Sequence, residues 1–268
     1  MPVRTKVLRF LPHVALTALV ALSIAGCSSR QAEATTAETL REASINSASA
    51  GSVRFEMSVL VSGLIGEDLA VDADGVYDLE ASQMQVNLDA LGQDINAVMD
   101  GQSLYLKIPM LGSNWYKADL DSEEIASNPL TAVVEDPTKI LTWLQATGSD
   151  VTKIGTEEVR GEQADHYRTT LDLSKAAAML DGEERKQAEE ALKLLGHNEF
   201  PVDLWVNGDG LPVKLTYEMS FANSSEDMLR DASMKYAIEF FDWGQPVTVQ
   251  VPSGDVKDLE DILGLFGG

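Results

Sequence analysis

Cysteine and histidine, which carry much of enzyme and metal chemistry, are almost absent from the sequence. The 268 residues include one cysteine and three histidines. Cys27 stands alone and cannot form a disulfide within the chain. His13, His166 and His197 lie far apart, and none has the Glu-x-x-His or cysteine spacing of a metal site. Nucleophile elbows and glycine-rich phosphate loops are missing as well. We therefore expect no enzyme activity, no metal and no cofactor.

Basic residues are also few, 20 against 43 acidic ones. Three of the basic residues, Arg4, Lys6 and Arg9, fall within the first 26 positions. The rest of the chain is strongly negative, and such a charge repels the phosphates of nucleic acids and of anionic lipids. The composition therefore excludes a nucleic-acid-binding protein. Solubility alone explains an acidic surface equally well.

Apolar runs of membrane-spanning length are missing. The run Val14–Ile24 has eleven residues, whereas a spanning helix needs about 20. It follows a basic start and ends in Ile24-Ala25-Gly26-Cys27, which looks like a lipobox. We predict that residues 1–26 are a signal peptide and that Cys27 becomes the lipidated N-terminus. Two or more acyl chains, such as palmitate, hold a protein on a bilayer.

The predicted mature chain has two parts. Residues 27–36 are small and polar, without apolar periodicity, and we expect a lipidated flexible tether. Residues 37–268 are expected to form one domain. The anchor places this domain on the extracytoplasmic face of the plasma membrane.

Strand-like alternation dominates the domain. Apolar residues recur at every second position in Val53–Val61 and Leu69–Leu79, and around Val86, Ala97 and Leu106. Turn residues separate these five runs, which predicts an antiparallel meander. Strands are also expected from Val151 to Arg168, in a hairpin with turn residues 207–210, and at Met234–Phe241.

Helical spacing predicts four helices between and around these strands. They cover residues 37–49, a segment around Ile140–Leu144, residues 174–195 with Ser174 as the N-cap, and residues 256–266. Consecutive strands with inserted helices indicate an α+β fold. We expect about eleven antiparallel strands in a strongly curved sheet, with the helices packed on its concave face.

A curved sheet of this size has more inner surface than a few short helices can cover, so we expect an apolar cavity. Methionines among the inward residues suit an irregular apolar wall, although each of them could equally fill a core. Strand alternation supplies the candidate lining residues: Phe55, Met57, Val59, Met84, Val86, Leu88, Leu104, Leu106, Leu204, Leu215 and Met219. The helix with Ile140, Leu141 and Leu144 is the candidate lid.

Several segments resemble a known family. They are the lipobox, GQSLYLK at 101–107 before Trp115-Tyr116, GTEEVRG at 155–161 before His166-Tyr167, and PVDLWVNGDGLPV at 201–213. In these the chain resembles the actinobacterial LppX and LprG lipoproteins (the LppX-LprAFG family) and, more distantly, the LolA and LolB carriers. The resemblance implies a LolA-like half-barrel closed by helices over a hydrophobic cavity that binds acylated lipids.

Two functions remain open from the sequence. The first is a membrane-anchored lipid carrier of the cell envelope, which acts as a monomer and exchanges acylated lipid with the membrane or a membrane lipid exporter. The second is an anchored interaction or sensor module with a solid core and no lipid ligand. The sequence does not name the lipid.

Overall fold

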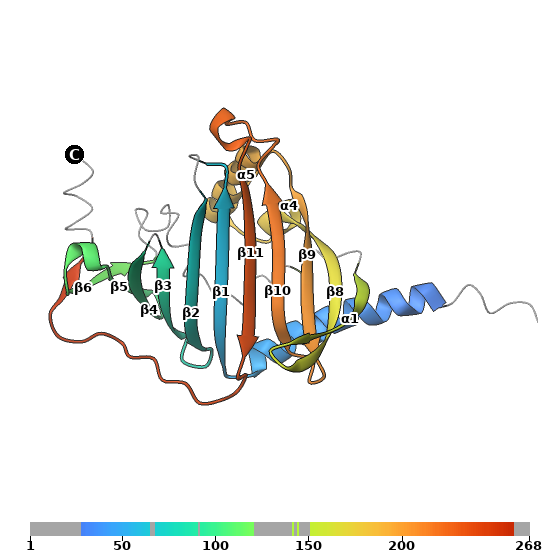
Figure 1. The fold of residues 1–268 in the computed structure, drawn as a ribbon, viewed down its shortest axis with the longest axis horizontal. Coiled ribbons are helices and arrows are strands. Elements are labelled where there is room, and N and C mark those ends of the chain that lie inside the picture. The colour runs from blue at the N-terminus through green and yellow to red at the C-terminus, as the bar shows by residue number, and fades with distance from the viewer. Residues whose placement is uncertain are drawn as a thin grey trace, which may run out of the picture.

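The computed structural model describes residues 28–64, 68–90, 92–120, 141, 144 and 151–259. Within these residues a twelve-stranded sheet and a few helices form the fold (Figure 1). The strands of the first half are β1 (Ser52–Ser62), β2 (Leu69–Asp78), β3 (Gln83–Ala90), β4 (Gln93–Asp100), β5 (Ser103–Lys107) and β6 (Trp115–Asp119). Those of the second half are β7 (Thr152–Val159), β8 (Glu162–Asp172), β9 (Glu199–Asn207), β10 (Pro212–Ser220), β11 (Ser233–Phe241) and β12 (Val256–Asp258).

The helices are α1 (Ser28–Ser49), α4 (Leu173–Ala178) and α5 (Gly182–Leu195). Two short 3-10 turns lie at Pro109–Leu111 and Asp227–Leu229. None of the helices in the described ranges is both long enough and apolar enough to cross a membrane.

The sheet consists of two meanders joined in its middle. Its strand order is β12-β6-β5-β4-β3-β2-β1-β11-β10-β9-β8-β7, and each neighbouring pair is antiparallel except β12 with β6. The central pair β1–β11 joins residues far apart in the chain: Arg54 pairs with Phe241, and Ser62 with Ser233. The predicted curved antiparallel sheet is therefore confirmed, with a parallel strand at one edge.

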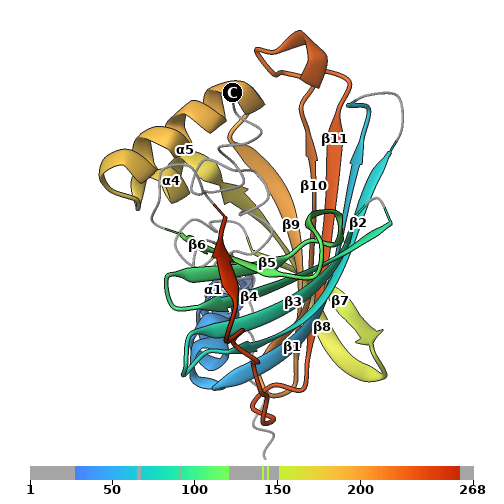
Figure 2. The same ribbon diagram turned by 90° about the vertical axis from the view of Figure 1, so that its left-hand side faces the viewer.

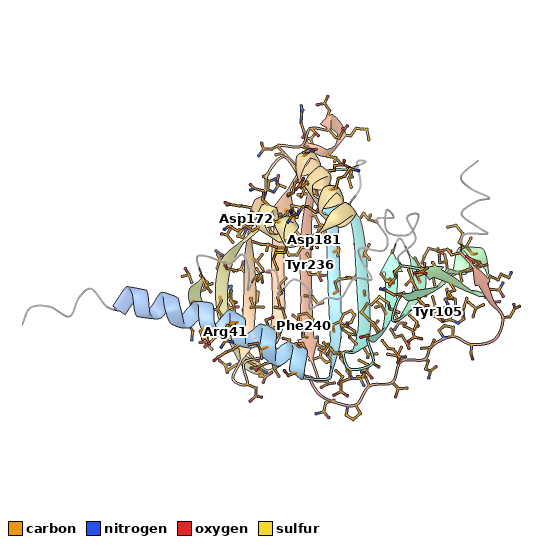
Figure 3. The ribbon with its side chains drawn as sticks, turned by 180° about the vertical axis from the view of Figure 1, so that it is seen from behind. Arg41, Tyr105, Asp172, Asp181, Tyr236 and Phe240 are labelled. Atoms are coloured by element: carbon orange, nitrogen blue, oxygen red, sulfur yellow. The ribbon has the colours of Figure 1, made fainter. Side chains whose placement is uncertain are left out.

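All three helices lie on one side of the curved sheet (Figure 2). Seen from that side, α1 crosses one end of the central strands and α5 lies near the other (Figure 3). We call this the inner face and the opposite one the outer face. The end of α1 is tied to the β9–β10 turn, because the Asn46 amide donates to the carbonyl oxygens of Asp209 and Gly210, both at 3.2 Å.

The main hydrophobic core lies between the inner face and the elements that cover it. Alternate residues of the central strands enter this cluster from the sheet. Leu40 and Ala43 of α1, Leu141 and Leu144, and Leu259 enter it from the covering side. Apolar residues that alternate along the strands and apolar residues at helical spacing therefore pack against each other in one core.

The helix expected at residues 174–195 is two helices, so this prediction is wrong in two respects. Asp181 is extended and Gly182 has a φ of 58°, a left-handed conformation that interrupts the helix. The N-cap is Asp172 and not Ser174, since its carboxylate accepts from the backbone N–H groups of Ser174 and Lys175 at 2.9 and 3.2 Å.

The C-terminal helix predicted at residues 256–266 is also wrong where the structure describes it. Val256–Asp258 form β12, which pairs in parallel with Trp115–Lys117 of β6. The segment after β11 runs extended past the ends of the strands to reach this edge (Figure 1). β12 forms backbone hydrogen bonds with β6, which would otherwise be an edge strand. The spacing of apolar residues alone does not reveal this need for a partner strand. Residues 260–268 lie outside the described part.

At the other end of the chain, α1 begins at Ser28. Residues 28–36, expected to be a flexible tether, are therefore the first turns of a helix, and several of them are good helix formers. Residues 1–26, Cys27 and Ile140 lie outside the described residues, whereas Leu141 and Leu144 are helical as predicted.

Candidate functional site

All eleven residues predicted to line a cavity lie on the inner face in one apolar cluster. Nine of them are buried in the packed core: Phe55, Met57, Met84, Val86, Leu88, Leu104, Leu204, Leu215 and Met219. Val59 and Leu106 are only partly buried. The two described lid candidates, Leu141 and Leu144, are 3% and 1% exposed and pack in the same cluster.

Burial of the inner face decreases along the central strands. On β1 the exposed fraction is 3% for Phe55 and 8% for Met57, and Val59 is then part-exposed. On β11 Ile238 and Phe240 are 1% exposed, whereas Tyr236 and Met234 are part-exposed. The inner face is therefore closed over one half of the central strands and part-exposed over the other.

We call the part-exposed region the inner apolar surface. It consists of Val59, Val71, Tyr217, Met234 and Tyr236, which pack against the core but retain accessible area. The register places them next to one another, since Val59 pairs with both Val71 and Tyr236, and Tyr236 pairs with Tyr217. The inward positions of β1 and β11 carry no charged side chain.

The closed half is packed so tightly that one position admits only glycine. Gly75 lies opposite Phe55, whose ring occupies the space above it. A Cβ at Gly75 would lie 2.5 Å from Cζ of Phe55 and 2.7 Å from the carbonyl oxygen of Gln85. Around Gly75 and Phe55 the inner face is therefore a filled core.

Two tyrosines stand out on the inner apolar surface. The rings of Tyr217 and Tyr236 are stacked, with centroids 4.8 Å apart and planes inclined by 13°, and Phe200 packs on Tyr217 at 5.2 Å. Burial raises the pKa of Tyr217 to about 12, and burial and then the neighbouring Tyr217 raise the pKa of Tyr236. Both rings nevertheless keep accessible area. Protein therefore covers most of this pair and leaves part of it accessible.

The outer face carries a different constellation, centred on His166. Its Nδ1 lies 3.0 Å from Glu157 and its Nε2 2.7 Å from Asp203, while its ring stacks on Trp205 with centroids 4.2 Å apart. Trp205 also donates to Glu157 at 3.0 Å, and Arg168 donates twice to Asp203. These contacts bind β7, β8 and β9 together, so we assign the network a structural role.

Two carboxylates of this network have shifted pKa values. Hydrogen bonds from Trp205 and then His166 lower the pKa of Glu157. Burial alone would raise the pKa of Asp203, but hydrogen bonds from Arg168 and His166 outweigh it and lower that pKa.

The tip of the β7–β8 hairpin folds back onto the outer face. Arg160 donates to Glu56 of β1 at 2.8 and 3.0 Å and to Glu239 of β11 at 3.1 Å. Its guanidinium also lies over the ring of Phe241, 4.1 Å from the centroid. Glu56 and Glu239 are cross-strand neighbours, so Arg160 compensates two like charges that would otherwise repel.

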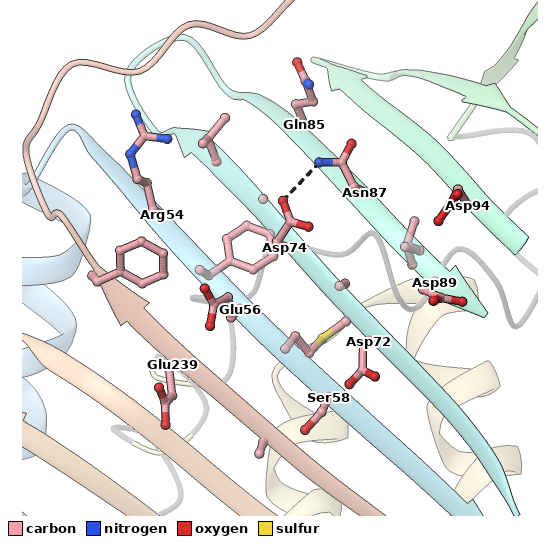
Figure 4. Close-up of a pocket in the computed structure, with 18 of the residues that line it drawn as sticks. Arg54, Glu56, Ser58, Asp72, Asp74, Gln85, Asn87, Asp89, Asp94 and Glu239 are labelled. Carbon is pink, nitrogen blue, oxygen red and sulfur yellow. Dashed lines mark hydrogen bonds between the residues drawn. The ribbon is translucent and has the colours of Figure 1, made fainter. Parts of the chain in front are cut away.

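A groove of about 970 Å³ runs along the outer face of β1 to β3. Figure 4 shows its polar lining, with Asn87 donating to Asp74 at 3.0 Å. Its acidic residues are Glu56, Asp72, Asp74, Asp89, Asp94 and Glu239. Such a lining is unsuited to an apolar ligand. In the described part of the chain, no group of three or more histidine, cysteine or acidic residues is arranged to hold a metal ion.

Sequence reasoning missed Tyr217 and Tyr236 as site candidates. The available signal is that both stand at inward positions of consecutive strands, where the neighbouring inward residues are aliphatic or methionine. Alternation identified the correct face, but it did not separate the filled half from the part-exposed half.

Comparison with known proteins agrees with this architecture. No protein-family model matches the chain. A 31.2 kDa protein from the rplA–rplJ intergenic region of Streptomyces griseus is 33% identical over 124 residues, which are 45% of this chain and 38% of that protein. The match therefore spans well under half of that relative.

Among solved structures, the chain is similar to LprF from Mycobacterium bovis, with a TM-score of 0.51 and 14% identity over 82% of this chain and 98% of that one. For the lipoprotein LppX from Mycobacterium tuberculosis the TM-score is 0.49 and the identity 16%, over 81% and 99% of the two chains. The likeness to LprF confirms the fold expected from the sequence resemblance.

Proposed function

We propose that this protein is a lipoprotein, anchored through Cys27, that binds acylated lipids against the inner apolar surface and carries them to or through the cell envelope. The observation that carries the proposal is the part-exposed stretch of Val59, Val71, Tyr217, Met234 and Tyr236 beside a fully packed core. Folding normally buries such residues completely, and contiguous apolar area that stays accessible to solvent is a candidate interaction site.

An acyl chain matches this surface in chemistry. The inward positions around it are apolar and uncharged, and each methylene removed from water contributes about 0.8 kcal/mol. The acidic groove on the opposite face offers no such environment. Leu141 and Leu144 pack on the same core, and in this proposal their helix is the lid that admits the lipid.

The anchor and the surface act together in this proposal. Lipidated Cys27 would keep the domain on the extracytoplasmic face of the plasma membrane, where donor and acceptor membranes or a membrane lipid exporter are within reach. The acidic domain is repelled by an anionic bilayer. It would therefore approach the bilayer through its anchor and not lie flat on it.

The alternative is an anchored interaction module with a solid core. It draws support from the nine candidate residues that are buried in the packed core. Native mass spectrometry of the chain carrying Cys27→Ser, purified without detergent, separates the two functions. A carrier shows an additional lipid mass that survives gel filtration and is removed by organic extraction. A protein mass without lipid would contradict the proposal.

A pair of substitutions on adjacent residues locates the bound lipid. Val59→Trp fills the inner apolar surface and should reduce the co-purified lipid several-fold. Ser58→Trp places the same ring on the outer face of the same strand, where Ser58 is exposed, and should leave the lipid in place. Both variants should unfold within a few degrees of the parent, as expected for changes outside the packed core. Equal lipid in both would exclude the inner face as the site.

A further inference from the structure

Three hydroxyl groups lie in one row across the inner face. Thr169 of β8 pairs with Val202 of β9, Val202 pairs with Tyr217 of β10, and Tyr217 pairs with Tyr236 of β11. Neighbouring strands are about 4.8 Å apart, so the row extends over roughly 15 Å. The next residue in the row is Val59 of β1. Oxygen atoms gathered in one row of a largely apolar face require a physical reason.

Within the part of the chain that the structure describes, the hydroxyls of this row have no hydrogen-bond partner. Thr169 is 2% exposed, and its Oγ1 is buried without a hydrogen bond to the described chain. Within the described residues the two tyrosines make ring contacts, and neither phenol oxygen is in a hydrogen bond. A buried hydroxyl without a partner is unfavourable and uncommon in folded proteins. Among the described residues, Thr169 therefore lacks the partner that a buried hydroxyl needs, and Tyr217 and Tyr236 beside it remain part-exposed.

The charge of the missing partner follows from its surroundings. The inward positions of β1 and β11 provide no cation, and burial raises the pKa of both tyrosines. A carboxylate ligand bound beside Tyr236 would thus find no counter-charge on these two strands. A neutral carbonyl oxygen accepts a hydrogen bond from a phenol or a threonine hydroxyl without that cost.

We propose that Tyr217 and Tyr236, together with Thr169, form a hydroxyl row that donates hydrogen bonds to the ester carbonyl oxygens of an acylated lipid. The acyl chains then lie along the aliphatic residues beside the row. This inference rests on the proposed lipid binding and narrows the ligand class from acylated lipids in general to those whose acyl groups are carboxylic esters. Tyr236 stands in the middle of the inner face, between α1 and α5 (Figure 3).

Three pyrene-labelled probes of equal chain length test the row: an alkane, a fatty acid methyl ester and the free fatty acid at neutral pH. Each is titrated into the full chain carrying Cys27→Ser after organic extraction of bound lipid. The ester should bind more tightly than the alkane by about two- to twelvefold, the value of one net hydrogen bond. It should also bind more tightly than the carboxylate.

Tyr217→Phe and Tyr236→Phe keep the ring stack and remove only the hydroxyl, and Thr169→Val keeps the shape of its side chain. Each should lower ester affinity toward that of the alkane while alkane binding stays unchanged. Tyr105→Phe is the matched control, because Tyr105 lies on the outer face under Lys117. In the wild-type sequence the ester carbonyl stretch should move to lower frequency on binding, and this shift should shrink in the phenylalanine variants.

Equal binding of ester and alkane to the wild-type sequence would overturn the hydroxyl row and leave lipid binding standing. Equal loss of both probes in the phenylalanine variants would show that the tyrosines are structural, and would also overturn the row. Failure of all three probes would refute the proposed function and this inference with it.

Discussion

Inserting one carbon atom at Gly75 tests whether the closed half of the inner face is a filled core. In Gly75→Ala the new Cβ would lie 2.5 and 2.9 Å from two ring carbons of Phe55 and 2.7 Å from the backbone oxygen of Gln85. Phe55 is 3% exposed and has little room to move, and Gln85 is held in the β2–β3 ladder. Overpacking of this kind costs about 1–3 kcal/mol.

A smaller effect on the unfolded chain partly offsets this loss of stability. Replacing glycine restricts the unfolded chain and stabilises a compatible site by about 0.4–1 kcal/mol. The net expectation for Gly75→Ala is a loss of about 1–2 kcal/mol in the free energy of unfolding, measured by urea titration with circular dichroism. In a chain that also carries Phe55→Leu, the cost of the same substitution should fall by at least half, because the ring carbons are gone and only the Gln85 oxygen remains.

The matched control adds one carbon on the same strand in the part-exposed half. Val71 lies on the inner apolar surface, so Val71→Ile should change the free energy of unfolding by less than about 0.5 kcal/mol. The reasoning fails if Gly75→Ala stabilises the protein, or if Phe55→Leu leaves its cost unchanged. It also fails if Val71→Ile lowers the free energy of unfolding as much as Gly75→Ala does, because the inner face would then be equally filled at both ends.

Three further predictions concern the polar groups. Asp203→Asn should lower the free energy of unfolding by about 1–3 kcal/mol at pH 7. Because the pKa of Asp203 is lowered in the folded protein, its carboxylate stabilises the fold above its ordinary titration range, and this stabilisation is lost as pH falls through the folded pKa. A difference in the free energy of unfolding between Asp203→Asn and wild type that stays constant down to pH 3 would refute this. Arg160→Ala and Glu56→Gln should couple by about 0.5–1 kcal/mol in a double-mutant cycle, because the pair is partly exposed; coupling that is unaffected by 1 M salt would contradict an ion pair. Asp172→Ala should cost about 1 kcal/mol as the lost N-cap of α4, and Ser174→Ala should cost clearly less in the same urea titrations.

Strand positions were predictable because alternation is local. The predicted run Val53–Val61 is β1 within one residue at each end, and Met234–Phe241 is β11 within one residue. The resemblance of motifs along the chain also predicted the curved sheet with helices on its inner face. These features depend on the order of polar and apolar residues, which the sequence states directly.

The errors arise where distant partners decide the structure. Apolar spacing from Val256 onward suits a helix, but the backbone there completes the edge of β6. Helical spacing continues through Asp181-Gly182, but an extended residue followed by a positive φ separates α4 from α5. Neither the free edge nor the turn is visible in a hydrophobic pattern.

The depth of each inner residue could not be predicted either. Phe55 and Val59 have equivalent places in the alternation of β1, yet Phe55 is in the core and Val59 is part-exposed. The difference depends on which inward residues are covered by chain from the other side of the core. Sequence periodicity gives the direction of a side chain, and only the arrangement of the covering elements gives its burial.

The contrast between the two faces bears on which of the two proposed functions is more consistent with the structure. On the outer face, like charges at Glu56 and Glu239 are compensated by Arg160, and His166 has a carboxylate at each ring nitrogen. These outer-face groups thus have partners even where they are exposed to water. On the inner face it leaves Thr169 without a hydrogen-bond partner in the described chain and Tyr236 part-exposed. A module with a solid core has no need for such a surface, whereas a carrier requires one that a ligand completes.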